Sequence, residues 1–354
     1  MVLKEARLKQ RAYAIILAMK ISEIGEFGLI ELLSDIVDKT KNLQNASWQQ
    51  LLIGIGDDAA VWQSDSAIQL ATTDSLVQDT HFDLNITSWE ELGWKAIAVN
   101  LSDIAAMGGI PKYALVSLAL PGELETNCVS SLYQGMTSIA NQFGVVIAGG
   151  NIASASKATI SITVLGSLEN KFALIRSAAI PGNQIAITGY LGLSAAGLKM
   201  LKQKHSFDTE TSRLLKQAHL KPIPRVKEGQ ILLNQGVRAA IDISDGLIAD
   251  LAHICKASKV SARIDKNLVP IHPAVEANFK TDCQQLTLTG GEDYELLFAA
   301  DSQIIAQARQ EISCPITVIG EIIEGIPGHV ILVNAAGGNT PFQQTGWEHF
   351  KSNT

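Results

Sequence analysis

The sequence predicts an α/β (α+β) protein of two domains. Its 354 residues suffice for about two domains that each bury a core. Apolar residues make up 47% of the chain and charged residues 18%, which is a globular composition. Strand-like and helix-like segments are mixed and joined by short loops. We expect an N-terminal extension at 1–21, an N-terminal domain at 22–167 and a C-terminal domain at 168–354.

The N-terminal half begins with an expected helix at 22–38, where apolar residues recur at helical spacing. An alanine-rich helix at 90–107 is expected to end at two glycines, before Pro111. The other expected elements of this half are strands "LLIGIG", "AAVWQ" and "IQLATTD", strand "YALVSLAL", a helix at 126–143, strand "GVVIAGG" and strand "TISITVLGS".

In the C-terminal half, Pro181 and Gly182 mark a turn before a strand in "NQIAITG". The corner "TGYLGLSAAGL" should open a helix, and another helix should follow Pro224. The remaining expected elements are strand "AAIDIS", helix "GLIADLAHICKAS", strand "ARI", a strand within "TGGEDYELLFAA", and strands near 316–322 and 329–333.

Composition excludes several partner classes. The net charge of -7 does not favour nucleic acid or an anionic membrane. No segment reaches the roughly 20 apolar residues needed to span a bilayer, and the basic-apolar start of the chain lacks a convincing cleavage site. The four cysteines are scattered without a CxxC, which is typical of reduced thiols in a cytosol. We predict a cytoplasmic protein without nucleic-acid or membrane partners.

Carboxylates gather at predicted element ends or on an apolar helix. They are Asp57, Asp58, Asp74, Asp103, Asp242 and Asp245. The segment "GIGDDAA" could be a simple hairpin turn, because Asp and Gly are common turn residues. A turn does not explain Asp103, because this residue lies on an apolar helix, where an unpaired carboxylate is costly to bury. A helix N-cap would explain Ser244 or Asp245 in "IDISDGL", but not Asp242.

This pattern favours Mg²⁺–phosphate chemistry. Mg²⁺ prefers oxygen ligands and commonly joins one or two carboxylates to phosphate oxygens, so several ions would let an acidic chain bind a polyphosphate. No His/Cys cluster indicates zinc. The corner "TGYLGLSAAGL" offers backbone N–H groups for an anion, although it is not a Walker A loop. Arg176 is either a surface residue or a bidentate clamp on a nucleotide phosphate.

Three other residues have two interpretations at this point. Glu292 in "TGGEDYELLF" fits an ordinary turn, but the two glycines before it would also let a ligand approach the backbone closely. His81 and Trp347 are core or surface residues by default. They become substrate contacts only if their loops converge.

Taken in order, the motifs resemble those of thiamine-monophosphate kinases, from about residue 22 to 350. They are "GEFGLI", "GIGDDAA", "TTDSLVQDTHF", "KAIAVNLSDIAAMGG", "RSAAIPG", "KPIPR", "IDISDGLIADL", "GGEDYELLF" and "GWEHF". The resemblance implies the two-domain aminoimidazole ribonucleotide synthetase-like fold, with an N-terminal sheet that pairs across a homodimer and a C-terminal α+β domain. It also implies ATP-dependent phosphorylation of thiamine monophosphate to thiamine diphosphate, the last step of thiamine diphosphate biosynthesis.

The same resemblance implies a set of site residues. The Mg²⁺ ligands would be Asp58, Thr72, Thr73, Asp74, Asp103, Asp242 and Asp245. Gly150, Asn151, Arg176 and Ser244 would contact ATP, and His81, Glu292 and Trp347 would contact thiamine monophosphate. Catalysis would depend on Asp74, Asp103, Asp242 and Arg176. One position departs from the pattern, because many members have Asp where this chain has Asn151 in "GGNIAS".

The acceptor in this reaction is a phosphate monoester, whose second pKa of about 6 leaves it largely ionised near neutral pH. A strong general base is therefore not required, and bound Mg²⁺ with Arg176 would neutralise repulsion during direct in-line transfer. Two alternatives remain open at this point. One is a superfamily relative that uses ATP to activate another substrate, and the other is a nucleotide- or thiamine-phosphate-binding sensor, suggested by Asn151.

Overall fold

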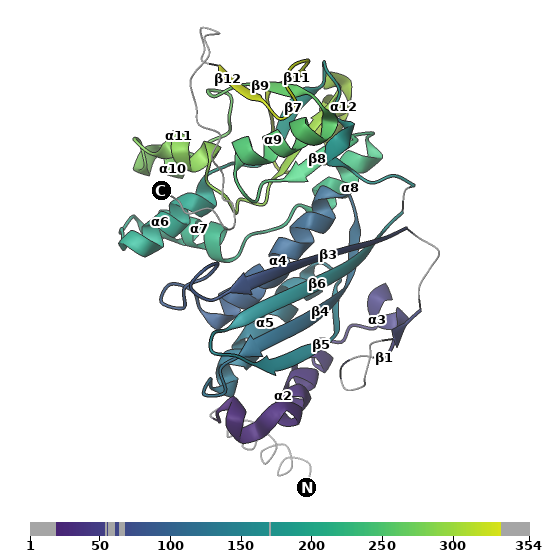
Figure 1. Cartoon of the computed structure of the whole chain (residues 1–354), viewed down its shortest axis with the longest axis vertical. Helices are drawn as coiled ribbons and strands as arrows, with labels where there is room; N and C mark the ends of the chain where they lie inside the picture. The colour runs from purple at the N-terminus through teal and green to yellow at the C-terminus, as the bar shows by residue number, and fades with distance from the viewer. Residues whose placement is uncertain (1–18, 54, 56–60, 64–67, 170, 334–354) are drawn as a thin grey trace. The chain divides into compact units, whose positions relative to one another are not determined.

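The computed structural model describes residues 19–53, 55, 61–63, 68–169 and 171–333 (Figure 1). The chain forms two compact units. Residues up to 100 and 111–167 make the first unit, whereas residues 101–110 and those from 168 onward make the second. Our division of the sequence placed 101–110 in the N-terminal domain. The structure groups this segment with the second unit, where Leu174 N–H donates to Met107 C=O and the Gln230 amide donates to Gly109 C=O.

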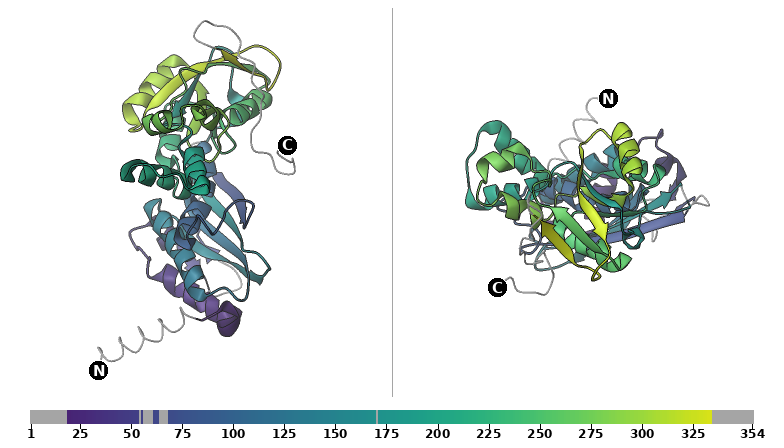
Figure 2. Two further views of the ribbon diagram at one scale, coloured as in Figure 1. Left: turned by 90° about the vertical axis from the view of Figure 1, so that its left-hand side faces the viewer. Right: turned by 90° about the horizontal axis from the view of Figure 1, so that it is seen from above.

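The first unit is built around a four-stranded sheet with strand order β3-β6-β4-β5, in which β4 and β5 are parallel. Helices α4 and α5 cover one face of this sheet (Figure 1, Figure 2). A short hairpin of β1 and β2 forms a separate ladder. The elements are α2 (Ile21–Asp38), α3 (Ala46–Gln50), β1 (Leu51–Ile53), β2 (Val61–Trp62), β3 (Ile68–Val77), α4 (Trp89–Ala106), β4 (Ile110–Leu120), α5 (Thr126–Gln142), β5 (Val146–Ser154) and β6 (Thr159–Leu168).

Burial explains why these segments are helices and strands. Residues of β6 alternate between buried and half-buried positions, as expected for a strand with one face on a core. Buried residues of α5 include Val129, Leu132, Met136 and Ile139, whose spacing places them on one stripe of the helix. That stripe supplies apolar area to the core of the unit.

The second unit contains a six-stranded sheet with strand order β12-β9-β11-β7-β10-β8, antiparallel except for the β12–β9 pair. Its elements are η1 (Arg176–Ala178), β7 (Gln184–Thr188), α6 (Leu193–Gln203), α7 (Thr209–Leu220), α8 (Val226–Asn234), β8 (Ala239–Asp242), α9 (Leu247–Ser258), β9 (Ser261–Asp265), α10 (Pro273–Asn278), α11 (Cys283–Leu288), β10 (Leu296–Ala300), α12 (Ser302–Glu311), β11 (Ile316–Ile323) and β12 (Val330–Val333). The main core of this unit joins α9 to the sheet through residues such as Ile241, Ile254 and Leu297.

Most expected elements are present, with three differences. Strand β5 continues through Asn151 to Ser154, so this asparagine lies within a strand rather than after it. Strand β3 extends beyond Asp74 to Val77. Helices α3, α7, α10, α11 and α12 were not predicted, and α7 contributes Leu215 to a second core cluster with α6 and α10.

Two further findings concern the chain as a whole. Among the helices of the described residues, none is long and apolar enough to cross a membrane. All four cysteines lie in described segments and are free thiols.

Candidate active site

Strand β8 of the second unit ends at one predicted site residue, and the turn that joins it to helix α9 carries two more. The turn spans 243–246, between Asp242 at the end of β8 and Leu247 at the start of α9. Asp242 is only 4% exposed, and its Oδ2 accepts a hydrogen bond of 2.7 Å from Ser102 Oγ. A carboxylate is thus held in a nearly dry position beside the segment that contains Asp103.

The electrostatics of Asp242 show which charges lie near it. Burial raises the pKa of the Asp242 carboxyl to about 7, and the neighbouring Asp103 carboxylate raises it as well. The Ser102 hydrogen bond and the positive charge of Arg176 act in the opposite direction. Asp103, Asp242 and Arg176 therefore form one electrostatic group in this unit, with two like charges and one counter-charge.

A second group lies at the start of α9. Oxygen atoms of Asp245 and Asp250 and a ring nitrogen of His253 lie within 4.8 Å of one another. Burial raises the pKa of Asp250 to about 8, and the negative charges of Asp242 and Asp245 add to this effect. The sequence reading did not select Asp250 or His253. Their spacing of three residues on a helix was the signal available, because it places both side chains on one face.

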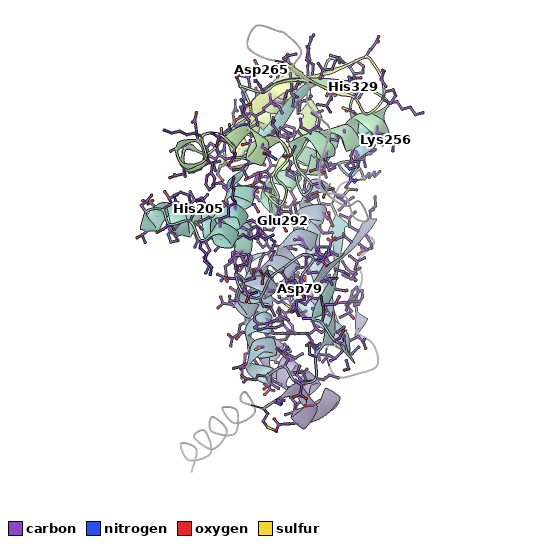
Figure 3. All side chains as sticks on the ribbon, turned by 60° about the vertical axis from the view of Figure 1, so that its left-hand side comes forward. Asp79, His205, Lys256, Asp265, Glu292 and His329 are labelled. Carbon is purple, nitrogen blue, oxygen red and sulfur yellow. The ribbon has the colours of Figure 1, made fainter. Side chains whose placement is uncertain are left out.

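The segment "GGEDYE" runs along the same turn. Glu292 N–H donates to Ser244 C=O at 2.9 Å, and Tyr294 N–H donates to Ile243 C=O at 2.9 Å. Both Glu292 and Tyr294 have positive φ, at 66° and 52°, which is costly for residues with a side chain. These hydrogen bonds bring Glu292 beside Ser244. The side chain of Glu292 is labelled in Figure 3.

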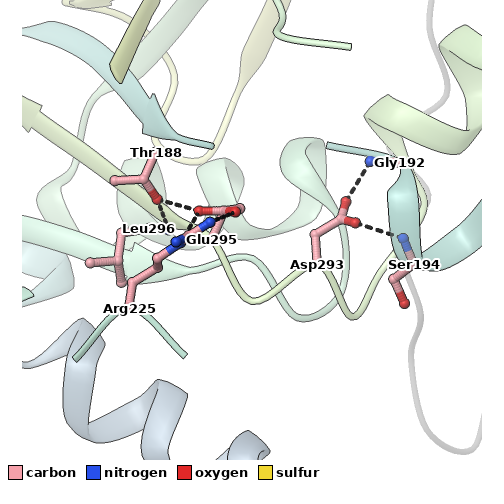
Figure 4. Close-up of polar contacts among 7 residues, drawn as sticks. All are labelled: Thr188, Gly192, Ser194, Arg225, Asp293, Glu295 and Leu296. Carbon is pink, nitrogen blue, oxygen red and sulfur yellow. Dashed lines mark hydrogen bonds and ion pairs between the residues drawn. The ribbon is translucent and has the colours of Figure 1, made fainter. Parts of the chain in front are cut away.

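Asp293 caps helix α6 from outside that helix. The N-cap position is Gly192, which has no side chain, and Asp293 accepts hydrogen bonds from Gly192 N–H at 2.7 Å and Ser194 N–H at 3.0 Å (Figure 4). Burial raises the pKa of Asp293 to about 7, while these two N–H donors oppose the shift. These donors in the "TGYLGLSAAGL" corner, which the sequence offered to an external anion, are taken by the chain's own carboxylate.

Glu295 anchors the other end of this segment. It forms two hydrogen bonds with Arg225, from Nε at 2.7 Å and from Nη2 at 2.5 Å, and accepts a third at 2.7 Å from Thr188 Oγ1 (Figure 4). Burial raises the pKa of Glu295, and Arg225 opposes this. Arg225 lies in "KPIPR", and the sequence reading gave it no role.

His219, at the last turn of α7, lies close to Glu292. Its Nδ1 is 3.4 Å from Glu292 Oε2 and 3.1 Å from Ser194 Oγ. The His219 side chain is 7% exposed and that of Glu292 is 32% exposed. The buried imidazole of His219 therefore lies against the Glu292 carboxylate, which the resemblance assigns to thiamine monophosphate.

In the first unit, β3 carries the predicted ligands Thr72, Thr73 and Asp74 in succession. Successive side chains of a strand point to opposite faces, and the exposure pattern pairs Thr72 with Asp74 while Thr73 is on the other face. Thr73 Oγ1 donates to Ile162 C=O at 3.1 Å and accepts from Thr163 Oγ1 at 3.1 Å. The structure does not bring the Thr73 hydroxyl together with Asp74, because the strand period separates them.

The remaining predicted residues of this unit lie on other strands of the sheet or after a strand. His81 follows β3, and its Nδ1 accepts from Val77 N–H at 3.1 Å. Asn151 is exposed on β5 and is in register with Ser117 of β4. Gly150 has a structural requirement of its own, because a Cβ there would lie 1.8 Å from Val116 O. Asp57, Asp58 and Trp347 lie outside the described residues.

The two compact α/β units, which carry carboxylates at the end of a strand and at a helix start, each match a known protein family. Residues 56–168 match the family described as AIR synthase related protein, N-terminal domain, and residues 181–332 match its C-terminal domain. Together these matches cover well over half of the chain. The chain belongs to the AIR synthase related protein family, and the two-domain fold expected from the sequence is confirmed.

The relatives narrow this class further. Thiamine-monophosphate kinase of Bacillus subtilis (strain 168) is 37% identical over 311 residues, which are 84% of this chain and 94% of that protein. The crystal structure of thiamine-monophosphate kinase from Stenotrophomonas maltophilia K279a has a TM-score of 0.76 at 33% identity and covers 84% of this chain and 95% of its own. AaThiL complexed with AMPPCP and TMP has a TM-score of 0.72 at 33% identity, with 94% and 99% covered. Within its class, the chain belongs to the thiamine-monophosphate kinase family.

Proposed function

We propose that the chain phosphorylates thiamine monophosphate to thiamine diphosphate with ATP as co-substrate. The observation that carries this function is the electrostatic group of Asp103, Asp242 and Arg176 in a chain of this family. A buried and a half-buried carboxylate, with a hydroxyl donor and one exposed arginine, suit metal-assisted phosphate binding. A general base is not needed, because the acceptor phosphate is already largely ionised near neutral pH.

The donor set fits Mg²⁺. Asp103, Asp242 and Asp245 provide the hard oxygen ligands that this ion prefers, and the raised pKa of Asp242 reflects burial and a repulsion that a cation would relieve. In the first unit we assign Thr72 and Asp74 to Mg²⁺ as well, with Thr73 as the weaker assignment. When bound, Mg²⁺ supplies neutralisation of the phosphate oxygens and their alignment.

The residues that we assign to ATP and to thiamine monophosphate follow from the same resemblance. Arg176 and Ser244 are assigned to ATP in the second unit, and Gly150 and Asn151 in the first. Asn151 supplies an amide oxygen without a negative charge, so any ion that it contacts should be held less tightly than by a carboxylate. Glu292 is assigned to thiamine monophosphate, which its position beside Ser244 supports. His81 is assigned to the same substrate, on the resemblance alone.

We also propose a homodimer in the cytoplasm. One face of the β3-β6-β4-β5 sheet is covered by α4 and α5, whereas Thr73, Ser75, Ser161 and Thr163 lie exposed or half-exposed on β3 and β6 (Figure 1). The hydroxyls of Ser75 and Ser161 are 2.7 Å apart across these strands. A second copy pairing on this face would give a protein of twice the 37.9 kDa chain mass, which sedimentation equilibrium measures directly. The four free cysteines fit a reducing compartment.

The test of the activity uses purified protein with ATP, Mg²⁺ and thiamine monophosphate, and free thiamine as a parallel acceptor. We expect thiamine diphosphate from the monophosphate, and no phosphorylated product from free thiamine. Asp242→Asn should lower kcat by at least about 100-fold, equivalent to about 3 kcal/mol of transition-state stabilisation. Binding of Mg²⁺–ATP without turnover in the unaltered protein would refute the proposal and favour a sensor.

A further inference from the structure

The backbone of the turn at 243–246 is held by a single carboxylate oxygen. Asp250 Oδ2 accepts hydrogen bonds from Ser244 N–H, Asp245 N–H and Gly246 N–H, each at 3.1 Å. Asp250 is 1% exposed and lies in the first turn of α9. Three consecutive amides and the start of the helix therefore converge on one buried group.

Consecutive N–H groups that point in one direction form an anion-binding concavity, which in many proteins receives a phosphate. Here the acceptor oxygen is supplied by the chain itself, because Asp250 Oδ2 occupies the position where a phosphate oxygen would bind. These amides are thus committed before any ligand arrives. Recognition by this turn has to come from its side chains.

The other side of the turn is also fixed. Ser244 C=O accepts from Glu292 N–H, and Ile243 N–H donates to Glu295 C=O at 2.8 Å. Gly246 has φ of +115°, and a Cβ at this position would lie 2.9 Å from Thr289 backbone atoms. The turn is therefore clamped between α9 and the segment that precedes β10, with little freedom to change its backbone.

We propose that Asp250 is a positioning residue, whose carboxylate sets the backbone of the 243–246 turn so that Asp242, Ser244 and Asp245 keep the arrangement that Mg²⁺–nucleotide binding needs. This inference rests on the function proposed above for the same site. It differs from a direct ligand role, which the 4.8 Å grouping of Asp245, Asp250 and His253 would otherwise suggest. One Asp250 oxygen accepts three N–H groups and the side chain is almost fully buried, so its contacts serve the backbone.

The experiment compares Asp250→Asn and Asp250→Ala with the unaltered protein. Asparagine keeps an acceptor oxygen for the three N–H groups, whereas alanine removes it. Asp208→Ala is the matched control, because Asp208 also accepts a backbone N–H, from Thr211 at 2.9 Å, but at the exposed N-terminus of α7. Each variant is measured for kcat, for the Mg²⁺ concentration giving half-maximal rate, and for calorimetric binding of a non-hydrolysable ATP analogue with Mg²⁺. Hydrogen exchange of the peptide covering 243–247 reports the turn directly.

We expect Asp250→Ala to lower kcat by about 100-fold or more and to speed exchange in the turn, with Asp250→Asn recovering to within about 10-fold. Half-saturating Mg²⁺ should stay within about 3-fold in Asp250→Asn, and Asp208→Ala should match the unaltered protein in all four measurements. If Asp250→Ala does not fold, Asp250→Asn decides the matter through its kcat and exchange.

Three results would overturn this role. Half-saturating Mg²⁺ raised about 10-fold in Asp250→Asn, with kcat restored at high Mg²⁺, would make Asp250 a metal ligand. Exchange in the turn unchanged in the alanine variant would remove the positioning role, and so would near-normal kcat in that variant. If the unaltered protein lacks kinase activity, the function above fails separately, and a binding loss of about 10-fold for the ATP analogue in Asp250→Ala still supports positioning, whereas unchanged binding contradicts it.

Discussion

Replacing Arg225 by methionine should destabilise the second unit severely. The change removes a guanidinium that donates to both oxygens of Glu295, at 2.7 and 2.5 Å. Among the described residues, the Glu295 carboxylate then keeps one side-chain donor, Thr188. The side chains are 23% and 9% exposed, so water cannot fully replace the lost donors. Methionine retains much of the apolar stem of arginine and limits the packing loss.

The expected magnitude follows from the state of the remaining charge. Breaking a buried pair by removing one partner costs about 3–5 kcal/mol, because the other charge stays buried without compensation. A loss of this size should appear as a lower urea midpoint at unchanged slope. The double variant Arg225→Met with Glu295→Gln should recover part of the lost unfolding free energy, since a neutral amide costs less to bury than a carboxylate.

A second ion pair of the same unit provides the control. Arg263 donates to Glu321 from Nε and Nη2, but these side chains are 52% and 44% exposed. Arg263→Met should therefore cost no more than about 1 kcal/mol. Equal losses for the two methionine variants, or a loss below about 1 kcal/mol for Arg225→Met, would refute the argument that burial sets the energy of this network.

Three more outcomes can be measured with standard assays. Because burial raises the pKa of Asp293 to about 7, the native protein keeps a proton that the unfolded chain loses above about pH 4. The unfolding free energy should therefore fall as pH rises from 4 to 7. Asp293→Asn should reduce this dependence on pH, which urea titrations at several pH values measure. Gly150→Ala places a Cβ 1.8 Å from Val116 O and should cost about 1–3 kcal/mol or more, which an unchanged urea midpoint would contradict. Burial raises the pKa of the Cys255 thiol to about 12, so alkylation at pH 8 should spare it while partly exposed Cys283 reacts, as peptide mass spectrometry would show.

Local chemistry explains why much of the fold could be predicted. The segment "IDISDGL" combines a buried apolar strand, turn residues and a helix start, and the structure ends β8 at Asp242 and starts α9 at Leu247. The family of the protein could also be predicted, because the motifs occur in the order seen in that family, from about residue 22 to 350. Helix α7 was not predicted although Asp208, which accepts from Thr211 N–H, marks its N-cap: the helix is strongly polar, and its helical state depends on packing Leu215 between other helices.

The placement of Thr73 could have been foreseen from strand geometry. Thr72, Thr73 and Asp74 are consecutive in a regular strand, so a period of two already separates Thr73 from its neighbours. The assignment of all three to Mg²⁺ rests on the resemblance alone, which does not include this constraint. By contrast, the hydrogen bond from Ser102 to Asp242 joins residues 140 positions apart and has no local signal.

The acidic residues of the second unit show why the acidic character of a residue did not by itself predict its role in the site. Asp250 and Asp293 each accept backbone N–H groups of a helix start or turn, so their carboxyl oxygens stabilise the fold around the site. Asp242 instead is paired with one hydroxyl and lies near the like charge of Asp103. One clue to the difference was present in the sequence. The N-cap of helix α6 is Gly192, which has no side chain to cap the helix, and a carboxylate from a distant segment supplies that bond.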